Sequence, residues 1–369
     1  MSKDLLILFG TIPWLFFLLV VLAQNAGHGG NMSRRLKSLF LFALVFALIR
    51  YGIGYDYFSY KYIIDGNGQD YDLNRLELLP RLLIIISSKT HYQVFFAVCS
   101  FLTIWPIYYV SKKLSIHPLY SFTVYLLFPM CYLDGLGVVR NAVAFSMVFL
   151  MFYYIHSKKI GMSVICLAVA IGFHVSAVAA LVIYPLYYAF HKKSLHLILY
   201  LTSFLLPLVI APILDNYFSQ YSLLMKITNN IDKGITKTGG TFYYIMNAMA
   251  ILNLFYWDKL VRYKDDNKRY LALINIGVVI WNAFLSIDPT TAQRLSMFFI
   301  LFQVLLVPSY FYIKGRSSLR VIIRSFYVLL FISSLALDLY GYYGKERNMS
   351  NIPYQVFFLA PSDVLQHVD

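Results

Sequence analysis

The sequence has few charged residues. Asp, Glu, Lys and Arg make up 13 % of its 369 residues, whereas a soluble domain carries about 25 %. Hydrophobic residues make up 60 %. Runs such as 5–23, 195–214 and 321–337 are long enough for a hydrocarbon core, which takes about 20 helical residues to cross. The composition therefore excludes an ordinary soluble domain and predicts a protein embedded in a membrane.

The apolar runs lack the alternation of apolar and polar residues that is typical of membrane β-barrel strands. Within lipid the backbone must satisfy its own hydrogen bonds, so only helices and closed barrels can cross. The runs therefore predict an all-α polytopic membrane protein.

Cysteine is also scarce. Cys99, Cys131 and Cys166 all lie in apolar runs, without a C-x-x-C pair, so neither a disulfide framework nor a zinc site is expected. The sequence contains no H-E-x-x-H, Walker or G-x-G-x-x-G pattern. We therefore expect no metal and no cofactor.

Apolar runs bounded by charged or turn residues predict about twelve membrane spans. They cover residues 4–23, 36–50, 92–111, 118–133, 139–157, 160–173, 175–190, 195–214, 242–260, 268–287, 292–313 and 322–340. The first run is longer than the apolar part of a signal peptide, which predicts a retained span.

Positive charge is distributed in short clusters between these runs. The net charge of +14 would suit a nucleic-acid partner, but 18 of the 31 Lys and Arg residues lie in six alternate short loops. The positive-inside rule places these loops in the cytoplasm and both termini outside. The clusters are Arg34, Arg35, Lys37; Lys112, Lys113; Lys158, Lys159; Lys192, Lys193; Lys259, Arg262, Lys264, Lys268, Arg269; and Lys314, Arg316, Arg320, Arg324. The pattern favours membrane topology over nucleic-acid binding.

One further apolar segment, 76–88, is too short for a span, since 13 residues make a helix of about 20 Å. Counting it as a span would also place Lys112 and Lys113 outside. We therefore expect a re-entrant or interfacial segment on the outer side. The chain is expected to form a single integral membrane domain over 1–369, with outer loops at about 51–91 and 215–241 and an outer tail at about 341–369.

Three arginines lie at the outer ends of predicted spans: Arg50, Arg140 and Arg294. Arginine is costly in lipid, so it normally faces a cavity or a partner. Guanidinium groups bind phosphate oxygens in pairs and keep their charge, so three at one level would suit a diphosphate. The alternative is that each is an anchor whose charged end reaches the headgroups.

The stretch 50–60 combines Arg50 with two glycines, Asp56 and several tyrosines. The glycines permit a close turn. Tyrosine rings such as Tyr57 and Tyr60 suit sugars, because they stack on C–H faces and hydrogen-bond hydroxyls. Asp56 could hold an arginine or remove a proton from a sugar hydroxyl. The alternative is an interfacial aromatic belt with a solvated aspartate.

Two more ionisable residues are candidates, and the first of them lies near the level of the arginines. His174 separates the short runs 160–173 and 175–190, which places it within the membrane as a general base or a donor to phosphate. A packing histidine bonded to a carbonyl fits equally well. Glu77 opens the segment that contains Pro80. It could pair with an outer arginine or orient an acceptor sugar, or it could simply favour the start of a helix.

These motifs occur in an order that resembles the EpsG-like, Wzy-type family of surface-polysaccharide polymerases. The resemblance covers about 36–358. In this sequence the motifs are Arg50-x-Gly-x-Gly-x-Asp56-Tyr57 with Tyr60, Glu77-Leu-Leu-Pro80, Gly137-Val-Val-Arg140-Asn141-x-x-Ala144, Phe173-His174-Val-Ser176, Arg294-Leu295 and Ile352-Pro353-Tyr354. Two departures are Gly54-Tyr55-Asp56 in place of the usual G-T-D, and Asn141 where the family more often has Gln.

The resemblance implies a GT-C-like O-antigen or related polysaccharide polymerase in the bacterial inner membrane, with its site facing the periplasm. It would transfer a glycan from undecaprenyl diphosphate to a lipid-linked repeat unit, together with a partner protein that regulates chain length. Arg140 and Arg294 would clamp the diphosphate, with His174 or Asp56 as the base. Further contacts with substrate are expected from Arg50, Tyr57, Tyr60, Glu77, Asn141 and Tyr354.

Two other functions stay open. A transporter or flippase of lipid-linked oligosaccharide should have two pseudo-symmetric halves, and no internal repeat is present in the sequence. An O-antigen ligase or an acyltransferase is the other, and a ligase should carry a larger outer domain than 215–241 provides.

Overall fold

The structure is a computed structural model that describes residues 3–27, 31–54, 56–66, 73, 76–210, 240–285, 288–313, 317–344 and 351–359. The chain divides into two compact units, Met1–Val175 with Arg316–Asp369 and Ser176–Gly315. The expectation of a single domain stays a prediction.

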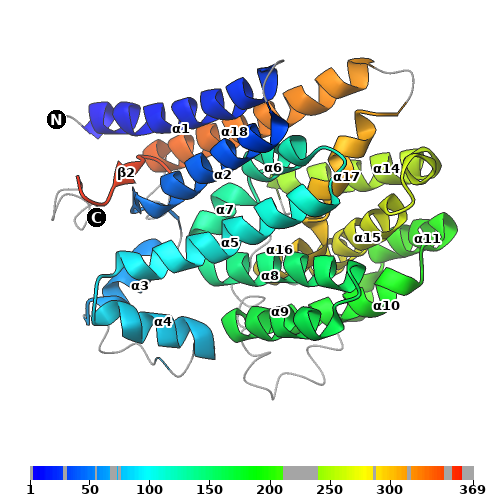
Figure 1. The fold of residues 1–369 in the computed structure, drawn as a ribbon, viewed down its shortest axis with the longest axis horizontal. Helices are drawn as coiled ribbons and strands as arrows, with labels where there is room; N and C mark the ends of the chain where they lie inside the picture. The colour runs from blue at the N-terminus through cyan, green and yellow to red at the C-terminus, as the bar shows by residue number, and fades with distance from the viewer. Residues whose placement is uncertain are drawn as a thin grey trace. The chain divides into compact units, whose positions relative to one another are not determined.

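The first unit is built almost entirely of helices (Figure 1). Its elements are α1 (Lys3–Ala26), α2 (Met32–Leu48), β1 (Arg50–Tyr51), α3 (Tyr57–Ile64), α4 (Leu78–Ser88), α5 (Gln93–Leu114), α6 (Pro118–Leu127), α7 (Tyr132–Gly137), α8 (Val139–His156), α9 (Ile160–Phe173), α18 (Ser317–Gly344) and β2 (Gln355–Val356). A 3₁₀ helix, η2 (Val175–Val182), follows α9 and leads into the second unit.

The second unit has α15 (Asn267–Phe284) as its most contacted helix. Around it pack α10 (Ile183–Tyr188), α11 (Lys193–Ser203), α14 (Gly240–Tyr263), α16 (Pro289–Ile300) and α17 (Gln303–Tyr310). Buried asparagines hold it: Asn282 donates to Ser203 Oγ at 2.9 Å, and Asn275 donates to the His196 carbonyl at 3.0 Å. Such bonds between helices are typical of membrane proteins.

The helical membrane class is confirmed, because each predicted span overlaps a described helix. By length and apolarity, α1, α5, α8 and α18 could each cross a membrane alone. A fifth crossing arises if α16 and α17, bent by 57° to each other, form one broken span. The number of about twelve crossings and the GT-C-like arrangement stay predictions.

Some predicted boundaries were wrong. The span at 118–133 is broken, because α6 ends at Leu127 and α7 begins only at Tyr132. Pro129 lies in the gap, and proline cannot donate the backbone hydrogen bond that would continue a helix.

In the expected outer loop, α3 buries Tyr57, Tyr60 and Ile64, which share one helical face. Residues 215–239 of the other predicted loop lie outside the described residues.

Helix α8 forms the core of the first unit. Its residues are buried on almost every side, as expected for a helix that is apolar all round. It packs against α5, α7 and α9, and α9 in turn contacts α4. The first turn of α8 therefore lies where several helices meet, and its side chains are held by the surrounding packing.

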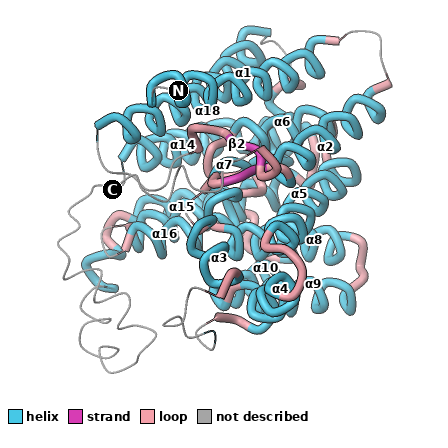
Figure 2. Tube along the Cα trace, turned by 90° about the vertical axis from the view of Figure 1, so that its left-hand side faces the viewer, coloured by secondary structure: helices cyan, strands magenta, loops and turns pink. Residues whose placement is uncertain are grey.

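The C-terminal segment joins the start of the chain to β1. Strand β2, drawn in magenta in Figure 2, pairs antiparallel with β1. Arg50 is opposite Val356 in this pairing. The Tyr354 N–H donates to the Gly10 carbonyl at 2.9 Å. The Tyr354 ring stacks on Phe46 with centroids 4.1 Å apart. These contacts fix β1, from which the Asp56 loop leads away.

Gly54 allows this loop to lie directly on the backbone between α7 and α8. Its φ is +99°, and a Cβ there would lie 2.5 Å from the Gly137 Cα and in contact with the Leu136 carbonyl. The Asp56 N–H donates to the Gly137 carbonyl at 3.3 Å across the same contact. Only glycine fits both the left-handed conformation and the close approach.

We predict that Gly54→Ala lowers stability by about 3 kcal/mol or more, because left-handed strain adds to a clash with backbone. Gly66→Ala is the matched control, since Gly66 also has a positive φ, +78°, but a Cβ there would meet nothing within 4 Å. It should cost only about 1–2 kcal/mol. Thermal unfolding in detergent measures both. Equal losses would show that the Gly54–Gly137 contact contributes nothing.

Candidate functional site

The centre of the site is an ion pair between Arg140 and Glu77. Arg140 is the second residue of α8, and Glu77 is the residue that precedes α4. The Arg140 Nη1 donates to Glu77 Oε2. The two side chains are 23 % and 19 % exposed, so the pair is largely enclosed but still reachable.

The second oxygen of Glu77 binds the end of α9. Glu77 Oε1 accepts a hydrogen bond from the Val175 N–H at 3.3 Å, and His174 is an electrostatic neighbour. Burial alone would raise the Glu77 pKa, but the positive charge of Arg140, His174 and these hydrogen bonds bring the net pKa below its ordinary value. One carboxylate thus connects α4, α8 and the residues after α9.

Arg140 also has neighbours from α3. Tyr60 and Asp56 act on its charge together with Glu77. Asp56 immediately precedes α3, and its backbone bond to Gly137 holds it near the start of α8. Three of the sequence-predicted residues, Asp56, Glu77 and His174, are therefore brought to the neighbourhood of Arg140.

Arg140 lies at the N-terminus of α8, where its charge adds to the partial positive charge of the helix. The N-terminus of a helix carries a partial positive charge, so a guanidinium there is not favoured by the helix dipole. Val138, at the N-cap of α8, supplies no side-chain cap. A helix start with uncapped N–H groups and an adjacent arginine is the kind of surface that binds an anion. In the described structure the Glu77 carboxylate binds the guanidinium of this arginine.

Glu77 does not act as a conventional helix cap. It lies at the N-cap of α4 but makes no side-chain cap hydrogen bond. Of the interpretations that the sequence left open, pairing with an outer arginine is the one the structure displays. Its contact with an acceptor sugar stays a prediction.

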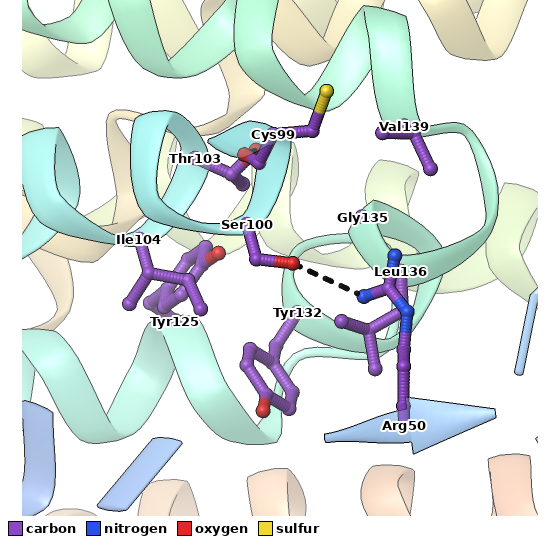
Figure 3. Close-up of a pocket in the computed structure, with 10 residues that line it drawn as sticks. All are labelled: Arg50, Cys99, Ser100, Thr103, Ile104, Tyr125, Tyr132, Gly135, Leu136 and Val139. Carbon is purple, nitrogen blue, oxygen red and sulfur yellow. Dashed lines mark hydrogen bonds between the residues drawn. The ribbon is translucent and has the colours of Figure 1, made fainter. Parts of the chain in front are cut away.

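Arg50 lies apart from this ion pair and is 1 % exposed. Figure 3 shows its guanidinium pointing from β1 toward Ser100, whose Oγ lies 3.5 Å from Nη1. The adjoining cavity has a volume of about 10 Å³, near the minimum for one water molecule. A diphosphate does not fit there, so the predicted substrate contact by Arg50 is not seen and stays a prediction.

The predicted sugar-binding tyrosines are packed. Tyr57 is stacked on Phe96, with centroids 4.1 Å apart, and its hydroxyl donates to Gln93 Oε1 at 3.0 Å. Burial raises the Tyr57 pKa. Tyr60 and Tyr354 are 4 % and 6 % exposed. The structure gives all three rings a packing role, and their contact with sugars stays a prediction.

Two other predicted residues complete the set. Asn141 follows Arg140 and is buried, and its Oδ1 has no hydrogen-bond partner among the described residues. Arg294 lies in α16 of the second unit and is partly exposed. The shared clamp of Arg140 and Arg294 stays a prediction.

Sequence reasoning missed Gln93 and the Val175 N–H. Gln93 Nε2 donates to the carbonyls of Leu48, at 2.5 Å, and Arg50, at 3.1 Å, and so it holds the exit of α2. A polar residue at the start of a long apolar run was the available signal. A backbone donor such as that of Val175 leaves no signal in a sequence.

Residues 36–356 of the chain match the sequence model of the EpsG family. No curated protein matches the chain, and no solved structure matches it.

We predict that Glu77→Gln lowers stability at pH 7 by about 1–3 kcal/mol, because Arg140 loses its counter-charge. Since folding lowers the Glu77 pKa, its stabilisation is complete above the unfolded value of about 4.3 and is lost as the pH falls through the lower folded value. The difference between wild type and Glu77→Gln should therefore shrink below about pH 4.3. Thermal unfolding against pH measures it.

The control is Asp65→Asn, which removes a partner of the more exposed pair between Lys61 Nζ and Asp65 Oδ2, 2.7 Å apart. It should cost about 0.5 kcal/mol or less. A Glu77→Gln effect that is the same at pH 7 and pH 4 would contradict the charge explanation.

Proposed function

The chain belongs to the EpsG family, and on that premise we propose that it polymerises lipid-linked sugar repeat units at the outer face of a bacterial inner membrane. The donor would be a glycan on undecaprenyl diphosphate. The acceptor would be the hydroxyl at the non-reducing end of a second lipid-linked repeat unit.

At the anomeric carbon the transfer forms one bond and breaks one. The acceptor oxygen forms a glycosidic bond to the anomeric carbon of the donor. The bond from that carbon to the phosphate oxygen breaks, and the lipid diphosphate leaves with the electron pair. The hydroxyl proton passes to a base. A diphosphate is already a good leaving group, so stabilising its developing charge matters more than protonating it.

The observation that supports this proposal is the environment of Arg140. Its guanidinium is partly exposed at an uncapped helix start and is paired with a carboxylate. A phosphate oxygen can replace that carboxylate, since a guanidinium binds either one through paired N–H donors. Glu77 would hold Arg140 in position until the diphosphate arrives. Arg294 would supply the second arm of the clamp.

Asp56 and His174 are equal candidates for the base. Asp56 neighbours Arg140, and His174 neighbours Glu77. Either could therefore lie beside a donor held by Arg140, with its proton acceptor toward the second chain. Glu77 ranks behind them, because its two oxygens are engaged by Arg140 and the Val175 N–H.

The proposal extends to the membrane arrangement. About twelve crossings in a GT-C-like fold, with α4 as a re-entrant or interfacial helix, would leave the Arg140 site open to the periplasm. Lipid-linked donor and acceptor would enter from the bilayer. A partner protein would set the chain length.

We predict that the purified protein in detergent lengthens a lipid-linked repeat unit without nucleotide, metal or membrane gradient. Arg140→Ala should lower the polymerisation rate about 100-fold or more, the size of effect seen when one transition-state donor is removed. Arg140→Lys should recover only part of it, because an ammonium lacks the paired donors. Gel electrophoresis of the labelled glycan measures the products.

Arg320→Gln, which removes an exposed arginine of α18, is the control and should leave the rate unchanged. Full polymer yield from Arg140→Ala would refute the clamp. No lengthening by wild type, together with movement of the lipid-linked glycan across vesicles, would instead establish a flippase.

A further inference from the structure

The surroundings of Arg50 show a buried charge without a counter-charge. Among the described residues no carboxylate lies within 4 Å of its guanidinium. Within the described part of the chain its Nε has no hydrogen-bond partner, and its contact with Ser100 is at the 3.5 Å limit. The ring of Phe96, 5.7 Å from Cζ, is its one cation–π partner among those residues. An unpaired buried cation is costly.

Arg50, Ser100 and Tyr125 line the cavity together with apolar residues such as Ile104, Leu136 and Val139. Tyr125 is buried, and its hydroxyl has no partner among the described residues. Ser100 accepts from Arg50, so its own proton can be donated elsewhere. Figure 3 shows these groups from β1, α5 and α6 around one space. The acidic side chains of the described residues do not line it.

The size of the cavity selects the class of ligand. At about 10 Å³ it is close to the space of a single water-sized sphere. A phosphate, a carboxylate or a sugar is too large for it. A monatomic ion is the anion nearest to that size, and the positive charge of Arg50 with neighbouring hydroxyl donors favours a negative ion.

We propose that this cavity binds one small monovalent anion of the halide class, with chloride as the physiological occupant. The anion accepts hydrogen bonds from Arg50, Tyr125 and Ser100 and neutralises the buried guanidinium. It thereby fixes β1, from which the loop to Asp56 begins. Binding of the anion requires neither the polymerase activity nor a lipid-linked substrate.

The test is thermal unfolding of the full-length protein in detergent, titrated with sodium chloride at constant ionic strength against sodium gluconate. Gluconate is too large for the cavity. Specific binding should raise the unfolding midpoint by about 3 °C or more as chloride saturates the site. Bromide should act similarly. A midpoint that depends on ionic strength alone, equal in both salts, would overturn the proposal and leave water as the occupant.

Two variants locate the effect. Tyr125→Phe removes one donor and keeps the ring, so about tenfold more chloride should be needed for half of the shift. Arg50→Gln should abolish the chloride dependence, and Arg320→Gln should retain it. The Tyr125→Phe result stands even if Arg50→Gln does not fold. A Tyr125→Phe protein with the wild-type chloride dependence would place the anion elsewhere and refute this site.

Discussion

The ion pair between Arg140 and Glu77 connects segments that are far apart in the sequence. Helix α8 is largely enclosed by its neighbours, but the Arg140 side chain in its first turn remains partly exposed. Arg140 adds a full positive charge at the positive end of that helix, where the dipole opposes it. One carboxylate oxygen of Glu77 binds the Arg140 guanidinium, and the other binds the Val175 N–H after α9. Removing either partner would leave the other enclosed and unpaired, which costs more than the pair itself contributes.

Two arginines at the exits of predicted spans are neutralised in different ways. Arg140 has a carboxylate partner and remains partly exposed, so an incoming anion can compete for it. Arg50 is enclosed among neutral side chains beside a small cavity that Ser100 and Tyr125 line together with apolar residues. Under the proposed function Arg140 would meet substrate, whereas Arg50 belongs to β1, the strand from which the Asp56 loop departs.

The sequence predicts the helices well, because long apolar runs leave the backbone few alternatives in a membrane. It also predicts that His174 lies near the level of Arg140; in the structure Asp56 and Glu77 neighbour the Arg140 charge, and His174 neighbours Glu77. The sequence could not predict the role of a side chain where that role depends on which residues pack against it in the fold. Tyrosine suits both a sugar site and a packed core, so the stacking of Tyr57 on Phe96 has no local signal.

Most other differences between the predictions and the structure also arise from contacts that a local sequence pattern does not reveal. Helix α3 is short, and its helical pattern rests on three buried residues within a polar, turn-rich segment. Arg50 lies in β1, which pairs with β2 across more than 300 residues of sequence. The pattern of apolar runs cannot predict such a long-range pairing. The break between α6 and α7 was the exception, since Pro129 marks it in the sequence.

The central claim is that Glu77 and Arg140 act on each other directly, and a double-mutant cycle on unfolding free energy tests it. Glu77→Gln, Arg140→Gln and the double variant would be measured in one detergent at pH 7. Direct pairing predicts a coupling energy of about 1–3 kcal/mol, with the double variant more stable than the sum of the single losses implies. Additive losses, with a coupling of about zero, would contradict the pair and the site built around it.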